Sequence, residues 1–201
     1  MILLCLMIVP ILICIKYSRR IKSDVASSIV KCLIFTIVTI LSNGLSAFSG
    51  NETFSYIMEA LYRFSFDLML IYVLQYSQQY TRVFHEVSPF KKGCFIIAYL
   101  DGILLFLNII FHNVFTIETV RFPNFDMYHV ADKSIIFYFH YVFAYGLVFC
   151  IIASFIIKII QIPDFYRKKY LPILVLMCVI TVSKFICGIL EFPIDVSLPF
   201  F

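Results

Sequence analysis

Several ionisable side chains lie inside long apolar stretches of this 201-residue chain. The candidates for chemistry among them are Glu59, Arg63, Asp67, Asp101, His140 and Lys184. Placing a charge at the centre of a bilayer costs about 2.5–3.5 kcal/mol on insertion scales, so each of these groups needs a partner or a function. Carboxylate, imidazole, guanidinium and amine groups gathered in one region can bind a polar or ionic ligand.

The first three of these residues share one helical face. Glu59, Arg63 and Asp67 follow one another at intervals of four residues, and residues at that spacing are neighbours on a helix surface. The pattern favours a structural ion pair in which two carboxylates flank the Arg63 guanidinium.

The depth of these groups in the membrane can be counted from the expected outer ends of the helices, at 1.5 Å per residue. Arg63, His140 and Lys184 then lie at about 8–10 Å, and Asp67 and Asp101 at about 16–18 Å. Two interpretations remain open. The groups are packing pairs that hold the helices in register, each worth about 0.6 kcal/mol, or these five residues line an outward-facing pocket for a ligand.

No catalytic residue is predicted, because the sequence holds no HExxH, no GxSxG and no Gly-rich phosphate loop. The seven cysteines lie within or at the edges of apolar stretches and form no CxxC pair, so they are expected to be small hydrophobic residues. His112, His129 and His140 match no standard zinc spacing. We expect no metal, no cofactor and no enzymatic activity in this chain.

The elements that must position these groups are six apolar segments. Hydrophobic residues make up 62% of the chain and charged residues 14%, whereas a soluble domain has about 25% charged residues. The segments lie near residues 1–15, 26–48, 56–77, 93–111, 135–157 and 171–190. A spanning helix needs about 20 residues, so six helices fill the length. The sequence predicts one all-α domain over residues 1–201, a polytopic transmembrane helix bundle.

Basic residues alternate between the connecting loops. The loops after the first, third and fifth segments hold eleven lysines and arginines, whereas the opposite loops hold only Arg121 and Lys133. Because lysine and arginine are retained on the cytoplasmic side, this bias predicts an amino terminus outside a plasma membrane that the chain crosses several times. The net charge of +4 is then a topology signal that meets the lipid bilayer, and no nucleic-acid partner is expected.

Two loops carry further information. The longest, roughly residues 112–134, is expected outside, either as an ordered aromatic cap or as a lid that touches ligand. The third inner turn is expected to start at Pro163, which ends the fifth helix, and to close before Pro172 at the start of the sixth.

The pattern resembles the N-terminal seven-helix sensor region of bacterial histidine kinases and related diguanylate cyclases. The third segment carries ALYRF at 60–64 and LQYS at 74–77, similar to the aromatic third helix of that family and its exit. The fifth and sixth segments carry YFHY at 138–141 and PDFYRKKY at 163–170, similar to the family's short inner loop. PIDVSLP at 193–199 is similar to the start of its seventh helix.

This resemblance implies a sensor module that detects an extracytoplasmic or membrane-borne signal. It implies a seventh helix beyond Phe201, a cytoplasmic kinase or cyclase domain after it, an unknown small ligand and a homodimer in the full-length protein. The alternative is a small transporter or channel-like protein. A reading frame that continues past Phe201 into about 20 apolar residues and a soluble domain would support the sensor, and a stop codon would exclude it.

Overall fold

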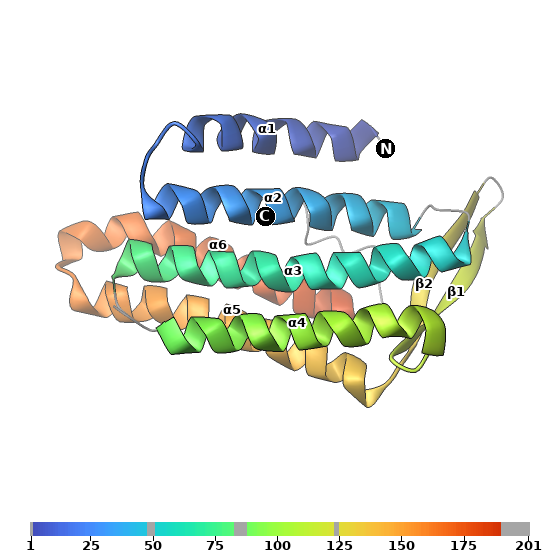
Figure 1. Cartoon of the computed structure of the whole chain (residues 1–201). Helices are drawn as coiled ribbons and strands as arrows, with labels where there is room; N and C mark the ends of the chain where they lie inside the picture. Colours follow the sequence, from blue (N-terminus) through green and yellow to red (C-terminus); the bar gives the residue numbers. More distant parts are fainter. Residues whose placement is uncertain (1, 48–50, 83–87, 123–124, 190–201) are drawn as a thin grey trace.

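The computed structural model describes residues 2–47, 51–82, 88–122 and 125–189 (Figure 1). Within these ranges the description excludes the side chains of residues 2–7, 47, 88, 120–122, 125–127, 164–166, 169, 180 and 183–189. The side chain of Lys184 is therefore outside the description, as are residues 193–199 of the expected approach to a seventh helix.

Six helices run side by side as a bundle, as the apolar segments predict (Figure 1). They are α1 Ile2–Ser18, α2 Asp24–Ala47, α3 Glu52–Thr81, α4 Ser88–Phe111, α5 Ile135–Gln161 and α6 Asp164–Ile189. Helix α3 packs against α2, α4 and α5, while α1 packs on α2 and α6 on α5. The all-α bundle is confirmed, and α3 occupies its centre.

Three of the described helices are long and apolar enough to cross a membrane, over Asp24–Ser46, Pro89–Phe111 and Ile135–Gln161. Their outward surfaces carry large apolar side chains, such as Ile110, Val142 and Phe149, which are 70–72% exposed. A helix on the surface of a water-soluble bundle places polar side chains there instead. The exposed surface of α4 and α5 is thus suited to lipid.

Helix α3 is more polar than the other long helices, and its charged and serine side chains face the interior of the bundle. Glu59, Arg63, Ser65 and Asp67 are all buried. The helix begins after Asn51, whose side-chain oxygen accepts a hydrogen bond from the Phe54 amide at 3.1 Å. This N-cap satisfies one of the free amides of the first turn. These buried polar groups lower the mean hydropathy of α3. The helix is nevertheless central, since it packs against α2, α4, α5 and β1.

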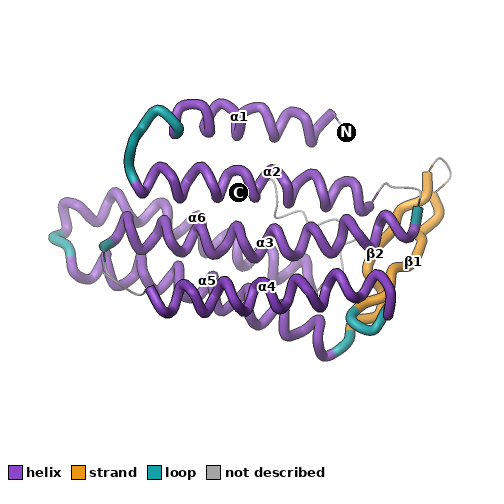
Figure 2. Tube along the Cα trace, in the orientation of Figure 1, coloured by secondary structure: helices purple, strands orange, loops and turns teal. Residues whose placement is uncertain are grey.

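The segment after α4 forms a β-hairpin at one end of the bundle (Figure 2). Strands β1 Phe115–Phe122 and β2 Phe125–Lys133 are antiparallel, with Ile117 opposite Val130 and Thr119 opposite Tyr128. The sequence predicted a long loop at 112–134, either an ordered cap or a lid, and did not predict these strands. The alternation of apolar and polar residues from Phe115 to Glu118, rich in β-branched types, is the period-2 signal for them.

The turn between α5 and α6 is shorter than predicted. Helix α6 begins at Asp164, so Pro172 lies inside it and not at its start. The Arg167 Nε atom donates hydrogen bonds to the Ile159 carbonyl at 3.1 Å and the Ile162 carbonyl at 3.4 Å. Carbonyls at a helix end lack intrahelical partners, and a basic side chain can satisfy them. Arg167 therefore caps α5 from within α6.

Candidate functional site: two polar groups inside the bundle

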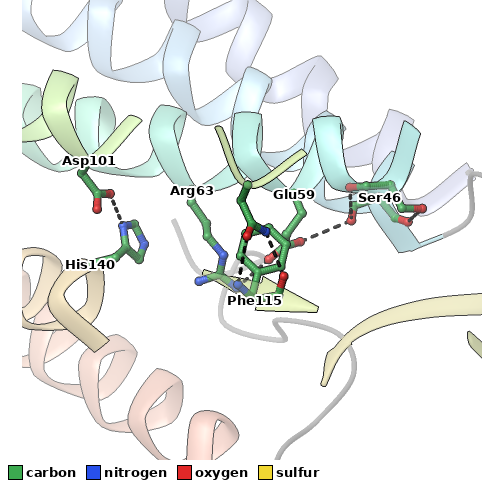
Figure 3. A network of polar contacts seen from close by, with 8 residues as sticks. Ser46, Glu59, Arg63, Asp101, Phe115 and His140 are labelled. Atoms are coloured by element: carbon green, nitrogen blue, oxygen red, sulfur yellow. Dashed lines mark hydrogen bonds and ion pairs between the residues drawn. The ribbon is translucent and has the colours of Figure 1, made fainter. Parts of the chain in front are cut away.

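The buried charges separate into two groups around Arg63 (Figure 3). Toward the hairpin, Arg63 and Glu59 of α3 meet Ser46 of α2. On the other side lie Asp101 of α4 and His140 of α5, joined by a short contact. The predicted single set of converging charges is thus divided into two units with different chemistry.

The first unit is a buried ion pair whose carboxylate is bonded on both oxygens. An Arg63 Nη2 atom donates to Glu59 Oε1 one helical turn away, and Ser46 donates its hydroxyl to Glu59 Oε2 at 3.3 Å. Ser55 also donates its hydroxyl to the Ser46 carbonyl at 2.9 Å. Both oxygens of the Glu59 carboxylate are therefore engaged, and the unit joins α2 to α3.

Aromatic rings surround the guanidinium of the same pair. The Arg63 Cζ atom lies 4.1 Å from the centre of the Phe137 ring and 5.7–5.8 Å from the rings of Tyr62, Phe115 and Tyr141. A guanidinium over an aromatic face gains about 0.5–2 kcal/mol, more where water is excluded. Helix α5 and the hairpin thus stabilise a charge carried by α3.

Asp67 does not take part in this pair, contrary to the predicted triad. The Cα–Cβ bonds of a helix tilt toward its amino terminus, so the Arg63 side chain extends back toward Glu59 and away from Asp67. A glutamate that precedes its basic partner by four residues is also the better orientation. Asp67 instead turns toward His140.

The second unit combines one side chain from each of three helices. The Nδ1 atom of His140 lies 2.8 Å from Asp101 Oδ2 and 3.3 Å from Asp67 Oδ2. Asp67 is 0% exposed, Asp101 2% and His140 3%. One donor atom from each residue lies within 4.8 Å of the other two. We name these three residues the Asp–Asp–His cluster.

The Asp–Asp–His cluster includes a carboxylate that lacks hydrogen bonds. Neither oxygen of Asp67 has a hydrogen-bond partner among the described residues, although both are buried. A buried polar atom without a partner costs about 1–3 kcal/mol, and more where it is charged. Asp67 is therefore the carboxylate of this site whose acceptor atoms are unused, while on Arg63 the only buried atom without a partner among the described residues is Nε.

Apolar packing closes the bundle on the side of the cluster away from the hairpin. Leu70 and Ile71 of α3, Ala98 of α4, and Leu147 and Ile151 of α5 belong to one buried core. Each lies farther from the hairpin along its helix than the residue of the cluster on that helix. No polar path continues through these described core residues.

On the opposite side, the hairpin is tied to the helices. Asn108 of α4 accepts hydrogen bonds from the amides of Val114 at 2.6 Å and Phe115 at 3.3 Å, and donates to the Phe115 carbonyl at 2.9 Å. The Tyr56 hydroxyl of α3 accepts from the Ile117 amide at 3.0 Å. These bonds hold the Phe115 ring beside Arg63.

A small cavity of about 40 Å³ lies next to both units. Arg63 and His140 line it, together with Tyr62, Tyr141 and Tyr145. A space of this kind holds water when polar groups face it, as they do here. Asp67 and Asp101 are not among its lining residues, so the cavity reaches the cluster through His140.

Several residues of the site are uncharged, so a search of the sequence for charged residues in apolar segments could not find them. Ser46, Phe115 and Phe137 complete the surroundings of Arg63, but serines and phenylalanines are frequent throughout the chain. The depth estimate also separated His140 from the two aspartates. It assumed level helix ends, whereas α3 extends farther toward the hairpin than α5 (Figure 1).

Comparison with known proteins supplies no assignment. No protein-family model matches the chain, and a search of curated proteins finds no match. A functional assignment therefore depends on the site and on the sequence pattern.

Proposed function

We propose that this chain is the membrane-embedded sensor or receptor module of a bacterial signalling protein. It crosses the plasma membrane six times with its amino terminus and hairpin outside. It detects an extracytoplasmic or membrane-borne signal and passes it to a cytoplasmic kinase or cyclase domain. The resemblance of the third, fifth and sixth helices to the seven-helix sensor region supports this proposal.

The contact between the hairpin and the buried charges carries the proposal. Phe115 of β1 packs beside the Arg63 guanidinium and against the Phe137 ring, with ring centres 5.9 Å apart. Arg63 and His140 line one cavity. A ligand that displaces the hairpin must therefore disturb the surroundings of a charge on the central helix. Such a link from an outer element to the bundle core is what a receptor requires.

The apolar core beyond the cluster supports a receptor over the alternative, a transporter or channel. A transport pathway needs polar groups or water along its whole length. In the described bundle, Ser77 and Ser154 lie beyond the core, but each hydroxyl donates to a carbonyl of its own helix. A receptor does not carry its ligand across the membrane, so it needs no polar pathway through its core.

Two measurements test the proposed function. The purified chain is reconstituted into liposomes with a pH-sensitive dye, and a potassium diffusion potential is imposed. A sensor gives no proton or ion flux above empty liposomes, whereas sustained flux would favour the transporter. The genomic reading frame downstream of Phe201 is the second test, with a seventh helix and a kinase or cyclase domain as the expected result.

A further inference from the structure

We propose that Asp67, Asp101 and His140 form a binding site for a divalent transition-metal cation, of the Zn²⁺ or Mn²⁺ class, inside the helix bundle. The three side chains come from α3, α4 and α5, so the ion would join three helices at one point. Binding of the ion does not depend on the sensor assignment, because it concerns this chain alone.

The geometry of the donor atoms matches such an ion. With bonds of about 2.0–2.1 Å, the ligand atoms of a tetrahedral site lie about 3.3 Å apart. The His140 Nδ1 atom lies 3.3 Å from Asp67 Oδ2 and 2.8 Å from Asp101 Oδ2. The donor atoms of Asp67 and Asp101 lie within 4.8 Å of each other, so the aspartate side chains must adjust before all three ligands surround one ion.

The Asp67 carboxylate is the second, independent observation. Both of its oxygens are buried with no hydrogen bond to any residue that the structure describes, and Oδ2 lies 3.3 Å from the His140 Nδ1 atom. The Glu59 carboxylate, two turns away on the same helix, has partners on both oxygens. Glu59 thus has partners for both oxygens, whereas Asp67 has unused acceptor atoms. These atoms lie close to Asp101 and His140, the other two proposed metal ligands.

Charge balance selects a divalent ion. Glu59 already neutralises Arg63, so the two aspartates of the cluster carry a charge of −2 when both are ionised. A neutral imidazole and a dication bring the total to zero, which avoids the high cost of an unpaired buried charge. Protons on His140 and on one aspartate would also bring the charge of the cluster to zero without a metal. The metal titration described below distinguishes the protonated cluster from the metal-bound one.

The donor set selects the type of divalent ion. Imidazole nitrogen suits Zn²⁺ and Fe²⁺, whereas carboxylates suit Mn²⁺ and also bind Zn²⁺. Mg²⁺ and Ca²⁺ prefer oxygen ligands throughout, and Mg²⁺ retains several waters. Three protein ligands leave one position of a tetrahedral ion open, and the cavity lined by His140 can supply water for it.

The test is a titration of the purified chain in lipid nanodiscs after removal of metals with a chelator. Calorimetry with ZnCl₂, and separately with MnCl₂, is expected to show one saturable site per chain, with no comparable heat for MgCl₂ or CaCl₂. Asp67→Asn, Asp101→Asn and His140→Ala should each lower the affinity for Zn²⁺ at least about 100-fold, since loss of an outer-shell partner alone costs 10- to 100-fold.

Two control variants preserve the comparison. Glu118→Gln changes an exposed carboxylate of the hairpin, and His129→Gln changes a histidine of the same hairpin. Both should retain the Zn²⁺ affinity of the unchanged chain. Binding that is insensitive to the three cluster variants, or lost equally in His129→Gln, would overturn the proposal.

A measurement on the protein with its original sequence tests the site without relying on variants that must fold. X-ray absorption of the Zn²⁺-loaded protein should show nitrogen and oxygen ligands at about 2.0–2.2 Å and no sulfur at about 2.3 Å. A sulfur shell would assign the ion to cysteines and refute the site. The absence of stoichiometric binding would leave the cluster with protons alone, and the proposal would fail while the sensor assignment stood.

Discussion

Phe64 of α3 occupies the space that a side chain at Gly102 of α4 would need. A Cβ atom built on Gly102 would lie 2.5 Å from Cδ2 and 2.8 Å from Cε2 of the Phe64 ring. Gly102 follows Asp101 directly, so this close approach of the two helices also brings Asp101 toward Asp67. A glycine of α4 at a point of close helix contact thus stands next to a residue of the Asp–Asp–His cluster.

Gly102→Ala is expected to destabilise the bundle by about 1–3 kcal/mol, the usual cost of overpacking a core. Reversible unfolding in mixed micelles measures the change. Gly93→Ala and Gly146→Ala are matched controls, because nothing lies within 4 Å of a Cβ atom at either position. Equal effects at all three glycines would show that helix propensity and not packing is the cause.

Arg63→Ala is expected to lower the free energy of unfolding by about 3–5 kcal/mol, because it leaves Glu59 buried without its partner. The double variant Glu59→Gln with Arg63→Met should lose much less, since replacing a whole buried pair with neutral groups is often tolerated. A double-mutant cycle in mixed micelles gives the coupling energy. Coupling of Arg63 to Asp67 as strong as to Glu59 would contradict the observed pairing.

Asn108→Ala should loosen the hairpin without unfolding the bundle. Two backbone amides and one carbonyl of residues 114–115 would lose their partner, at about 1–3 kcal/mol. Hydrogen exchange should become faster at Val114 and Phe115. Thr116→Val is the control, because Thr116 bonds only to exposed Asp132 across the hairpin in the described contacts. Unchanged exchange in Asn108→Ala would mean that the hairpin is held by its apolar side alone.

The orientation in the membrane can be read by cysteine labelling in a background without native cysteines. Glu118→Cys on the hairpin should react with an impermeant reagent in intact cells, and Lys168→Cys in α6 only after permeabilisation. This outcome follows from the eleven-to-two distribution of basic residues between alternate loops. The reverse labelling pattern would invert the proposed topology.

The helices could be predicted from their apolar stretches, which in α3 continue between the buried charges, and the burial of charge could be predicted from its cost in hydrocarbon. The partner of Asp67 could not. It depends on the direction of the Arg63 side chain and on the unequal ends of α3 and α5, which are properties of packed helices. The hairpin was missed because its period-2 pattern is short and lies between much stronger helical signals.

The start of α6 illustrates a different difficulty. Pro172 and the basic cluster at 167–169 resemble a turn in the sequence, yet both lie within the helix. Arg167 binds carbonyls at the end of α5, a role that depends on the fold of both helices.

The polarity of the central helix has a consequence for biogenesis. In the proposed topology, helix α3 carries Glu59, Arg63 and Asp67 and is a poor candidate for leaving the translocon alone. The residues that it contacts are made both before and after it: Ser46 of α2 before, and His140 of α5 long after. Glu59 and Arg63 would then enter lipid as a helical hairpin with α2. The contact of Asp67 with His140 forms only once α5 has been made, so this contact requires the assembled bundle.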